Sequence, residues 1–130
     1  MKPLMKGIIS VILLIISVLF TGNVTHGNFV GMEKHMDKRT IQATYQSFSG
    51  VLARKVNLRE SDRLRFTYQG QEGLRALVRQ GKDEVFIITN ASELTIPQDG
   101  HYAITVEGTA KNGAFDLTWV ITPAPKQNQS

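Results

Sequence analysis

From Thr40 onward the chain consists of short segments in which apolar and polar residues alternate, separated by polar or glycine-containing turns. The clearest segment is "RLRFTYQ", in which Leu64, Phe66 and Tyr68 fall on one face and arginine and threonine on the other. Alternation with a period of two is typical of a strand with one buried face. Repeated short segments of this kind, bounded by turn residues, predict an all-β domain.

Eight such segments occur between residues 40 and 123, and none of them has the period of a helix. They are "TIQATYQSF", "VLARKVNL", "RLRFTYQ", "LRALVRQ", "VFIIT", "LTIP", "HYAITVEG" and "AFDLTWVI". We predict a small antiparallel β-sandwich, jelly-roll-like, of about seven to eight strands, with a small barrel as the alternative. We expect "RLRFTYQ" to form a hairpin with "LRALVRQ", and the last two segments to form the closing hairpin.

The N-terminal region, residues 1–27, is interpreted as a signal peptide or signal-anchor. A short basic stretch, "MKPLMK", precedes the apolar run "GIISVILLIISVLF" at residues 7–20, which is typical of a secretory signal. Signal peptidase prefers small residues, and Thr25 and Gly27 come closest to its pattern. An uncleaved anchor is the alternative, with Lys2 and Lys6 held in the cytoplasm. Both interpretations place the domain outside the membrane.

Two further segments lie outside the predicted domain. Residues 28–39 contain glycine and mixed charge without a sustained period, which predicts a linker. Residues 124–130 form a polar tail after Pro123, which ends the last strand.

Cysteine is absent, which excludes disulfides, thiol nucleophiles, Cys-ligated zinc and iron–sulfur clusters. An exported domain without cysteine favours a Gram-positive bacterium. The chain of 130 residues has a formal net charge of +4, but without residues 1–27 it has 13 Lys+Arg against 11 Asp+Glu, or +2. Such a weak charge gives no basis for nucleic-acid binding. No cofactor and no metal ion are expected.

The ending "LTIPQDGHYAITVEGTAKNGAFDLTW" resembles the closing hairpin of small secreted β-sandwich proteins of unknown function from Gram-positive bacteria. These are similar to bacterial pre-peptidase C-terminal type domains. The residues that match are Gly100-His101-Tyr102 and Gly113-Ala114-Phe115, with Trp119 near the end. "NLRESDRLRFTYQG" resembles an earlier hairpin of the same group. The resemblance implies a fold and an extracellular location, and it implies no reaction.

The histidines offer little catalytic chemistry. His35 lies between Glu33 and Asp37, which could form a loose metal site, but a solvated linker is the preferred interpretation because a metal site needs a rigid frame. His101 follows "QDG" and is expected in a turn. No Gly-Xaa-Ser-Xaa-Gly elbow occurs, so a serine hydrolase of that type is not indicated.

Carboxylates give equally weak signals. Glu107 and Asp116 could be neighbours across the closing hairpin, yet Asp116 alternates with core positions and is expected to be solvated. A calcium ion at Asp99 or at residues 83–84 remains an open alternative to ordinary turn chemistry, since calcium takes six to eight oxygens.

Arginines are the most distinctive surface feature. If "RLRFTYQ" and "LRALVRQ" form a hairpin, Arg63, Arg65, Arg75 and Arg79 share its outer face, around Leu77. Like charges across strands cost stability. These four arginines are therefore the candidate surface for an anionic envelope component, whether a polymer, a lipid headgroup or a protein. A solvated face relieved by nearby acidic residues is the alternative.

We therefore expect a non-enzymatic binding or accessory module, secreted or membrane-anchored, at the outer face of the cell envelope. A carbohydrate-binding module is the first alternative, and an exposed row of aromatic side chains would favour it. A small hydrolase is the second alternative, and it would require His101 and a carboxylate to converge in a cleft.

Overall fold

The computed structural model describes residues 22–125, and 77% of the described residues lie in β-strands. No helix occurs among them, so no described helix could cross a membrane. The eight strands are β1 (Gly22–Val30), β2 (Glu33–Met36), β3 (Thr40–Leu58), β4 (Arg63–Gln69), β5 (Leu74–Gln80), β6 (Asp83–Ile88), β7 (Ala91–Thr95) and β8 (Gly100–Thr122).

All strand pairs are antiparallel and belong to one sheet, with β3 and β8 at its centre. These two strands pair along nearly their whole length, from Thr40 opposite Thr118 to Leu58 opposite Gly100. On the other side, β8 pairs with β5 through its first half and with β4 through its second half. The all-β antiparallel prediction is confirmed, whereas a division into two separate sheets is not seen.

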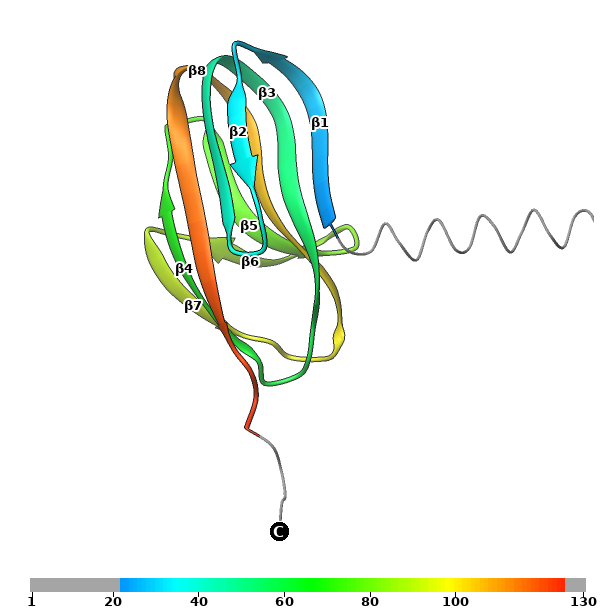
Figure 1. Cartoon of the computed structure of the whole chain (residues 1–130). Coiled ribbons are helices and arrows are strands. Elements are labelled where there is room, and N and C mark those ends of the chain that lie inside the picture. The colour runs from blue at the N-terminus through cyan, green and yellow to red at the C-terminus, as the bar shows by residue number, and fades with distance from the viewer. Residues whose placement is uncertain (1–21, 126–130) are drawn as a thin grey trace, which may run out of the picture.

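The sheet folds over along a crease that crosses its long strands (Figure 1). Gly31, between β1 and β2, and Asn112, within β8, both have positive φ, at 58° and 53°. Pairing of β3 with both neighbours is interrupted at Gln46, which lies between them. Glycine and asparagine tolerate this left-handed conformation better than other residues. The crease therefore lies where the sequence supplies these two residue types.

The core lies inside the folded-over sheet. Phe66 in β4 stacks on Phe86 in β6, with ring centroids 6.0 Å apart, although these strands are not hydrogen-bonded to each other. Trp119, Tyr102 and Phe48 are among the largest fully buried side chains. The predicted core positions of "RLRFTYQ" and of the two last segments are confirmed, because these side chains alternate with exposed ones.

Two predicted hairpins are wrong. The segments "HYAITVEG" and "AFDLTWVI" are the two halves of one strand, β8, and the glycines between them permit a bend rather than a reversal. Likewise "TIQATYQSF" and "VLARKVNL" form the single strand β3. "RLRFTYQ" and "LRALVRQ" are β4 and β5, which each pair with β8 but not with each other.

The predicted linker at residues 28–39 is also mostly strand. It contains the end of β1 and all of β2, which pair with β3 in one common register. The first half of β1, residues 22–27, falls within the predicted signal region, and residues 1–21 of that region lie outside the described residues. Glycines and mixed charge concealed these strands, since β1 and β2 lie at the sheet edge and bury few side chains.

Candidate functional site

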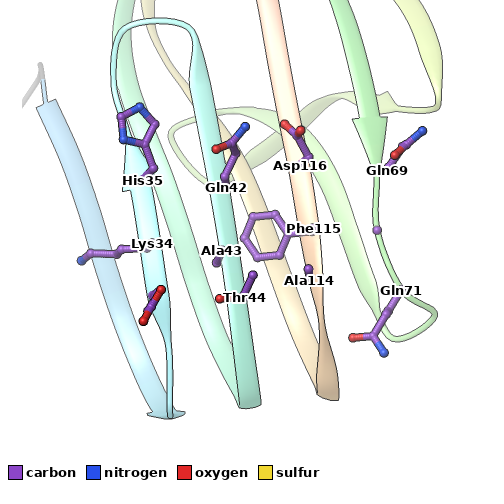
Figure 2. A pocket seen from close by; sticks show the side chains of 12 residues that line it. Lys34, His35, Gln42, Ala43, Thr44, Gln69, Gln71, Ala114, Phe115 and Asp116 are labelled. Atoms are coloured by element: carbon purple, nitrogen blue, oxygen red, sulfur yellow. The ribbon is translucent and has the colours of Figure 1, made fainter.

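A depression of about 690 Å³ lies on the outer face of the half of the sheet formed by β2, β4 and the adjoining parts of β3 and β8 (Figure 2). Four strands and the turn after β4 contribute to it. Its lining is mainly polar and consists of Glu33, Lys34, His35, Gln42, Ala43, Thr44, Gln69, Gly70, Gln71, Ala114, Phe115 and Asp116. We call this depression the transverse groove, because it runs across the strands.

One row of side chains forms the middle of the transverse groove. His35 lies opposite Gln42, Gln42 lies opposite Asp116, and Asp116 lies opposite Gln69. Residues directly opposite in antiparallel strands project from the same face. Figure 2 shows these four side chains at one level across β2, β3, β8 and β4. An imidazole, two amides and a carboxylate are thereby aligned across the sheet.

The turn after β4 closes one end of the transverse groove. Gln71 accepts a hydrogen bond from the Tyr45 hydroxyl and donates one from Nε2 to the Lys111 carbonyl, at 3.2 Å. Gly113 lies beneath Gln71, and a Cβ at this position would collide with the Gln71 side-chain amide. The side chain of Gln71 is therefore held in a fixed position against β8.

At the opposite end, His35 Nε2 lies 3.0 Å from Asp37 Oδ2. The Asp37 carboxylate also accepts a hydrogen bond from the Arg39 backbone amide, at 2.9 Å. The Arg39 amide chiefly, and His35 next, lower the pKa of Asp37 below its ordinary value of 3.8. Asp37 therefore carries a negative charge at neutral pH and adds to the acidic character that Glu33 and Asp116 give to the groove.

The groove has the geometry of a binding surface and not of a catalytic centre. His35 and Asp116 are separated by β3, and two strand spacings amount to about 10 Å. A general base must lie within roughly 2.6–3.2 Å of its partner. The amides and carboxylates instead offer several hydrogen-bond donors and acceptors at fixed spacing, together with an excess of negative charge.

The structure separates the four arginines that the sequence predicted as a partner surface. Arg75 and Arg79 lie on β5 beside the first half of β8, and Arg63 and Arg65 lie on β4 beside its second half. Arg65 Nε is 3.7 Å from Glu93 Oε2. The shared face required a β4–β5 hairpin, and that hairpin does not form.

Arg75 and Arg79 are also neutralised. Arg79 Nη2 lies 2.8 Å from Glu107 Oε1, Arg75 pairs with Glu84, and longer contacts complete a network of two arginines and two glutamates. Leu77, between the two arginines on the same face, is fully buried. These two arginines therefore flank an apolar side chain within a neutral network.

The remaining sequence candidates lie apart. His101 is the second residue of β8, not a turn residue, and its Nδ1 is hydrogen-bonded to the Asn57 side chain. Asp99 accepts a hydrogen bond from the Glu60 amide at 2.7 Å. Glu107 and Asp116 occupy different halves of β8 instead of facing each other. Within residues 22–125 no group of three or more potential metal ligands occurs.

Aromatic side chains do not form an exposed row in the described part of the chain, where each is buried or half-buried. Sequence reasoning did not identify the glutamines of the groove, Gln42, Gln69 and Gln71. Each lies at an outward position of a strand or in a turn, but only the pairing of β3, β8 and β4 shows that they meet.

Comparisons with known proteins give one informative similarity. No protein-family model and no curated protein matches the sequence. Among solved structures, the chain is similar to a periplasmic inhibitor of g-type lysozyme, PliG, from Aeromonas hydrophila. The TM-score is 0.50 at 14% sequence identity, and the match covers 68% of this chain and 92% of that one. This similarity supports a common fold.

Proposed function

We propose that this protein is a non-enzymatic module that acts outside the cytoplasmic membrane and binds a protein partner through the transverse groove. In this proposal the folded-over sheet serves as a small antiparallel β-sandwich that holds the groove residues in place. The observation on which the proposal rests is the aligned row of His35, Gln42, Asp116 and Gln69 across four strands.

The chemistry of the groove favours a basic partner. Glu33 and Asp116 line it, Asp37 lies at its end, and the one lysine of its lining, Lys34, donates a hydrogen bond to Thr25 at 2.8 Å. Complementary charge increases the association rate and the specificity of a protein interface. The fold shared with an inhibitor of g-type lysozyme supports a cell-wall-degrading enzyme as the partner class.

The test is inhibition of a g-type lysozyme. The purified chain is added to the enzyme with a cell-wall suspension, and the rate of clearing and the dissociation constant are measured. We expect inhibition by the native chain, and at least about tenfold weaker binding for Asp116→Lys, since like charge in an interface costs several kcal/mol.

Glu60→Lys is the matched control, because it makes the same charge change at an exposed position outside the groove lining. It should bind as the native chain does. Absence of binding to the lysozyme would contradict the proposed partner class, and equal effects of the two substitutions would contradict the role of the groove.

A carbohydrate-binding module is the second candidate function. The side-chain amides of Gln42, Gln69 and Gln71 and the carboxylate of Asp116 are groups that can hydrogen-bond sugar hydroxyls. Binding of soluble peptidoglycan fragments by the native chain, lost in Asp116→Lys and independent of any protein, would favour this function over protein binding.

A further inference from the structure

The start of β1 lies very close in sequence to the apolar run at residues 7–20. β1 begins at Gly22, so two residues of chain separate it from Phe20. Two residues span at most about 7 Å. If the apolar run stays in a bilayer, this distance holds the beginning of β1 next to the lipid headgroups, with no room for a flexible tether.

Pairing of β1 favours retention of the run over cleavage near Gly27. Residues 22–27 pair with residues 50–55 of β3. Cleavage after Gly27 would remove two thirds of β1 and leave these backbone groups of β3 at an open sheet edge, which proteins generally protect.

Cationic side chains gather around the start of β1. Gly22 lies opposite Lys55 in β3. The neighbouring Asn23 accepts a hydrogen bond from Arg54 Nη1 at 3.0 Å, and its own amide lies 3.5 Å from the Met36 carbonyl. Residues of β3 and the end of β2 therefore meet at the position where the chain enters the sheet.

The turn that follows Met36 adds further positive charge through Lys38 and Arg39, which are both exposed. Lys34, two residues before Met36, reaches Thr25 on β1, with Nζ 2.8 Å from Oγ1. We define the basic rim as these five side chains: Lys34, Lys38, Arg39, Arg54 and Lys55.

The charge of the basic rim is not compensated internally. Within residues 22–125 none of its five members forms an ion pair, whereas Arg65, Arg75 and Arg79 all do. The one carboxylate in the β2–β3 turn, Asp37, is bonded to His35 and to the Arg39 backbone amide. Uncompensated cations next to an apolar segment are attracted to anionic lipid surfaces.

We propose that the basic rim is a membrane-docking surface that contacts anionic lipid headgroups while residues 7–20 keep the chain in the bilayer. The chain then stands on the membrane by the start of β1 and β3, with the crease at Gly31 and Asn112 pointing away from it. This inference does not depend on the ligand of the transverse groove.

The full chain contains no cysteine, so a single introduced cysteine carries a unique fluorescent label. Lys38→Cys places the label at the basic rim, and Gln46→Cys places it at the crease, which serves as the matched reporter. The labelled full chain is reconstituted in vesicles of phosphatidylglycerol and phosphatidylcholine that contain a lipid with a nitroxide on its headgroup. We expect severalfold stronger quenching at residue 38 than at residue 46.

Charge dependence is the second readout. Lys55→Glu combined with Arg39→Glu should abolish the difference in quenching, whereas Lys111→Glu combined with Arg63→Glu, an equal charge change away from the rim, should preserve it. Salt at about 1 M, where the Debye length is about 3 Å, should weaken the quenching at residue 38 as well. This salt series uses chains with the native rim charges at all other positions, so it stands even if the double variant misfolds.

Three results would overturn the inference: equal quenching at residues 38 and 46, unchanged quenching in vesicles of phosphatidylcholine alone, or a native protein found in the medium with its N-terminus after Gly22. Binding of the rim to an acidic protein or a wall polymer without quenching by vesicles would also overturn it. The lysozyme test measures a different surface, so failure of one proposal is distinguishable from failure of the other.

Discussion

Arg79 and Glu107 form a two-contact ion pair across β5 and β8: Nη2 and Nε of the arginine lie 2.8 Å and 3.2 Å from the same glutamate oxygen. Both side chains are less than a third exposed. The pair lies at the corner of the charge network that flanks the buried side chain of Leu77. This arrangement gives Arg79 a packing role in addition to its charge.

Arg79→Ala should therefore lower the free energy of unfolding by about 1–2 kcal/mol, because it removes the pair and uncovers apolar surface. The measurement is urea denaturation monitored by the fluorescence of Trp119. Arg63→Ala, at an exposed arginine without an ion pair in residues 22–125, should change stability by less than about 0.5 kcal/mol. Equal losses in the two variants would contradict the packing role.

Asp62 ties the end of the chain to the turn before β4. It is buried, with 8% exposure, and it accepts hydrogen bonds from the Arg59 amide at 2.9 Å and the Ala124 amide at 3.0 Å. Asp62→Ala leaves two buried donors unpaired and should cost about 2–3 kcal/mol. Thermal unfolding monitored by circular dichroism measures this, and Asp83→Ala, at an exposed carboxylate, is the control. A small loss in Asp62→Ala would show that these bonds contribute little.

The crease gives a prediction about backbone conformation. Asn112 has a φ of 53°, a conformation in which a β-branched residue is strongly disfavoured. Asn112→Val should lower stability by about 1–2 kcal/mol, whereas Asn112→Gly should be neutral or stabilising. Melting temperatures of the two variants give the comparison. Equal melting temperatures would mean that β8 does not bend at this residue.

The pKa of Asp37 provides a prediction about pH. The Arg39 amide and His35 lower it below 3.8, so the contribution of Asp37 to stability is present above that pH and is lost as the pH falls through the folded-state pKa. Carboxyl chemical shifts followed by NMR against pH should show this lowered value. In His35→Ala the pKa should rise but stay below 3.8, because the Arg39 amide bond remains. A pKa at or above 3.8 in the native chain would refute the pair.

Local residue patterns predicted much of the fold. The alternation of Leu64, Phe66 and Tyr68 identified β4 and its buried face, because burial on one side of a strand leaves a period-two signature. The same reasoning failed at Gly108 and Asn112, since these residue types permit both a reversal and a bend, and the local sequence does not distinguish the two.

The candidate site was less predictable because it depends on pairing between distant strands. Gln42 and Asp116 are 74 positions apart in the sequence, and they become neighbours only through the β3–β8 register. The arginine surface failed for the same reason: it assumed that β4 and β5 pair because they are consecutive. Their common partner is β8, which separates Arg65 from Arg79.

Hydrogen–deuterium exchange of the full chain with and without a g-type lysozyme tests the central claim most directly. The proposal predicts protection in three segments at once: β2 with the start of β3, the turn after β4, and the part of β8 around Asp116. Protection confined to other surfaces, or no protection at saturating enzyme, would contradict the assignment of the transverse groove as a protein-binding site for this partner class.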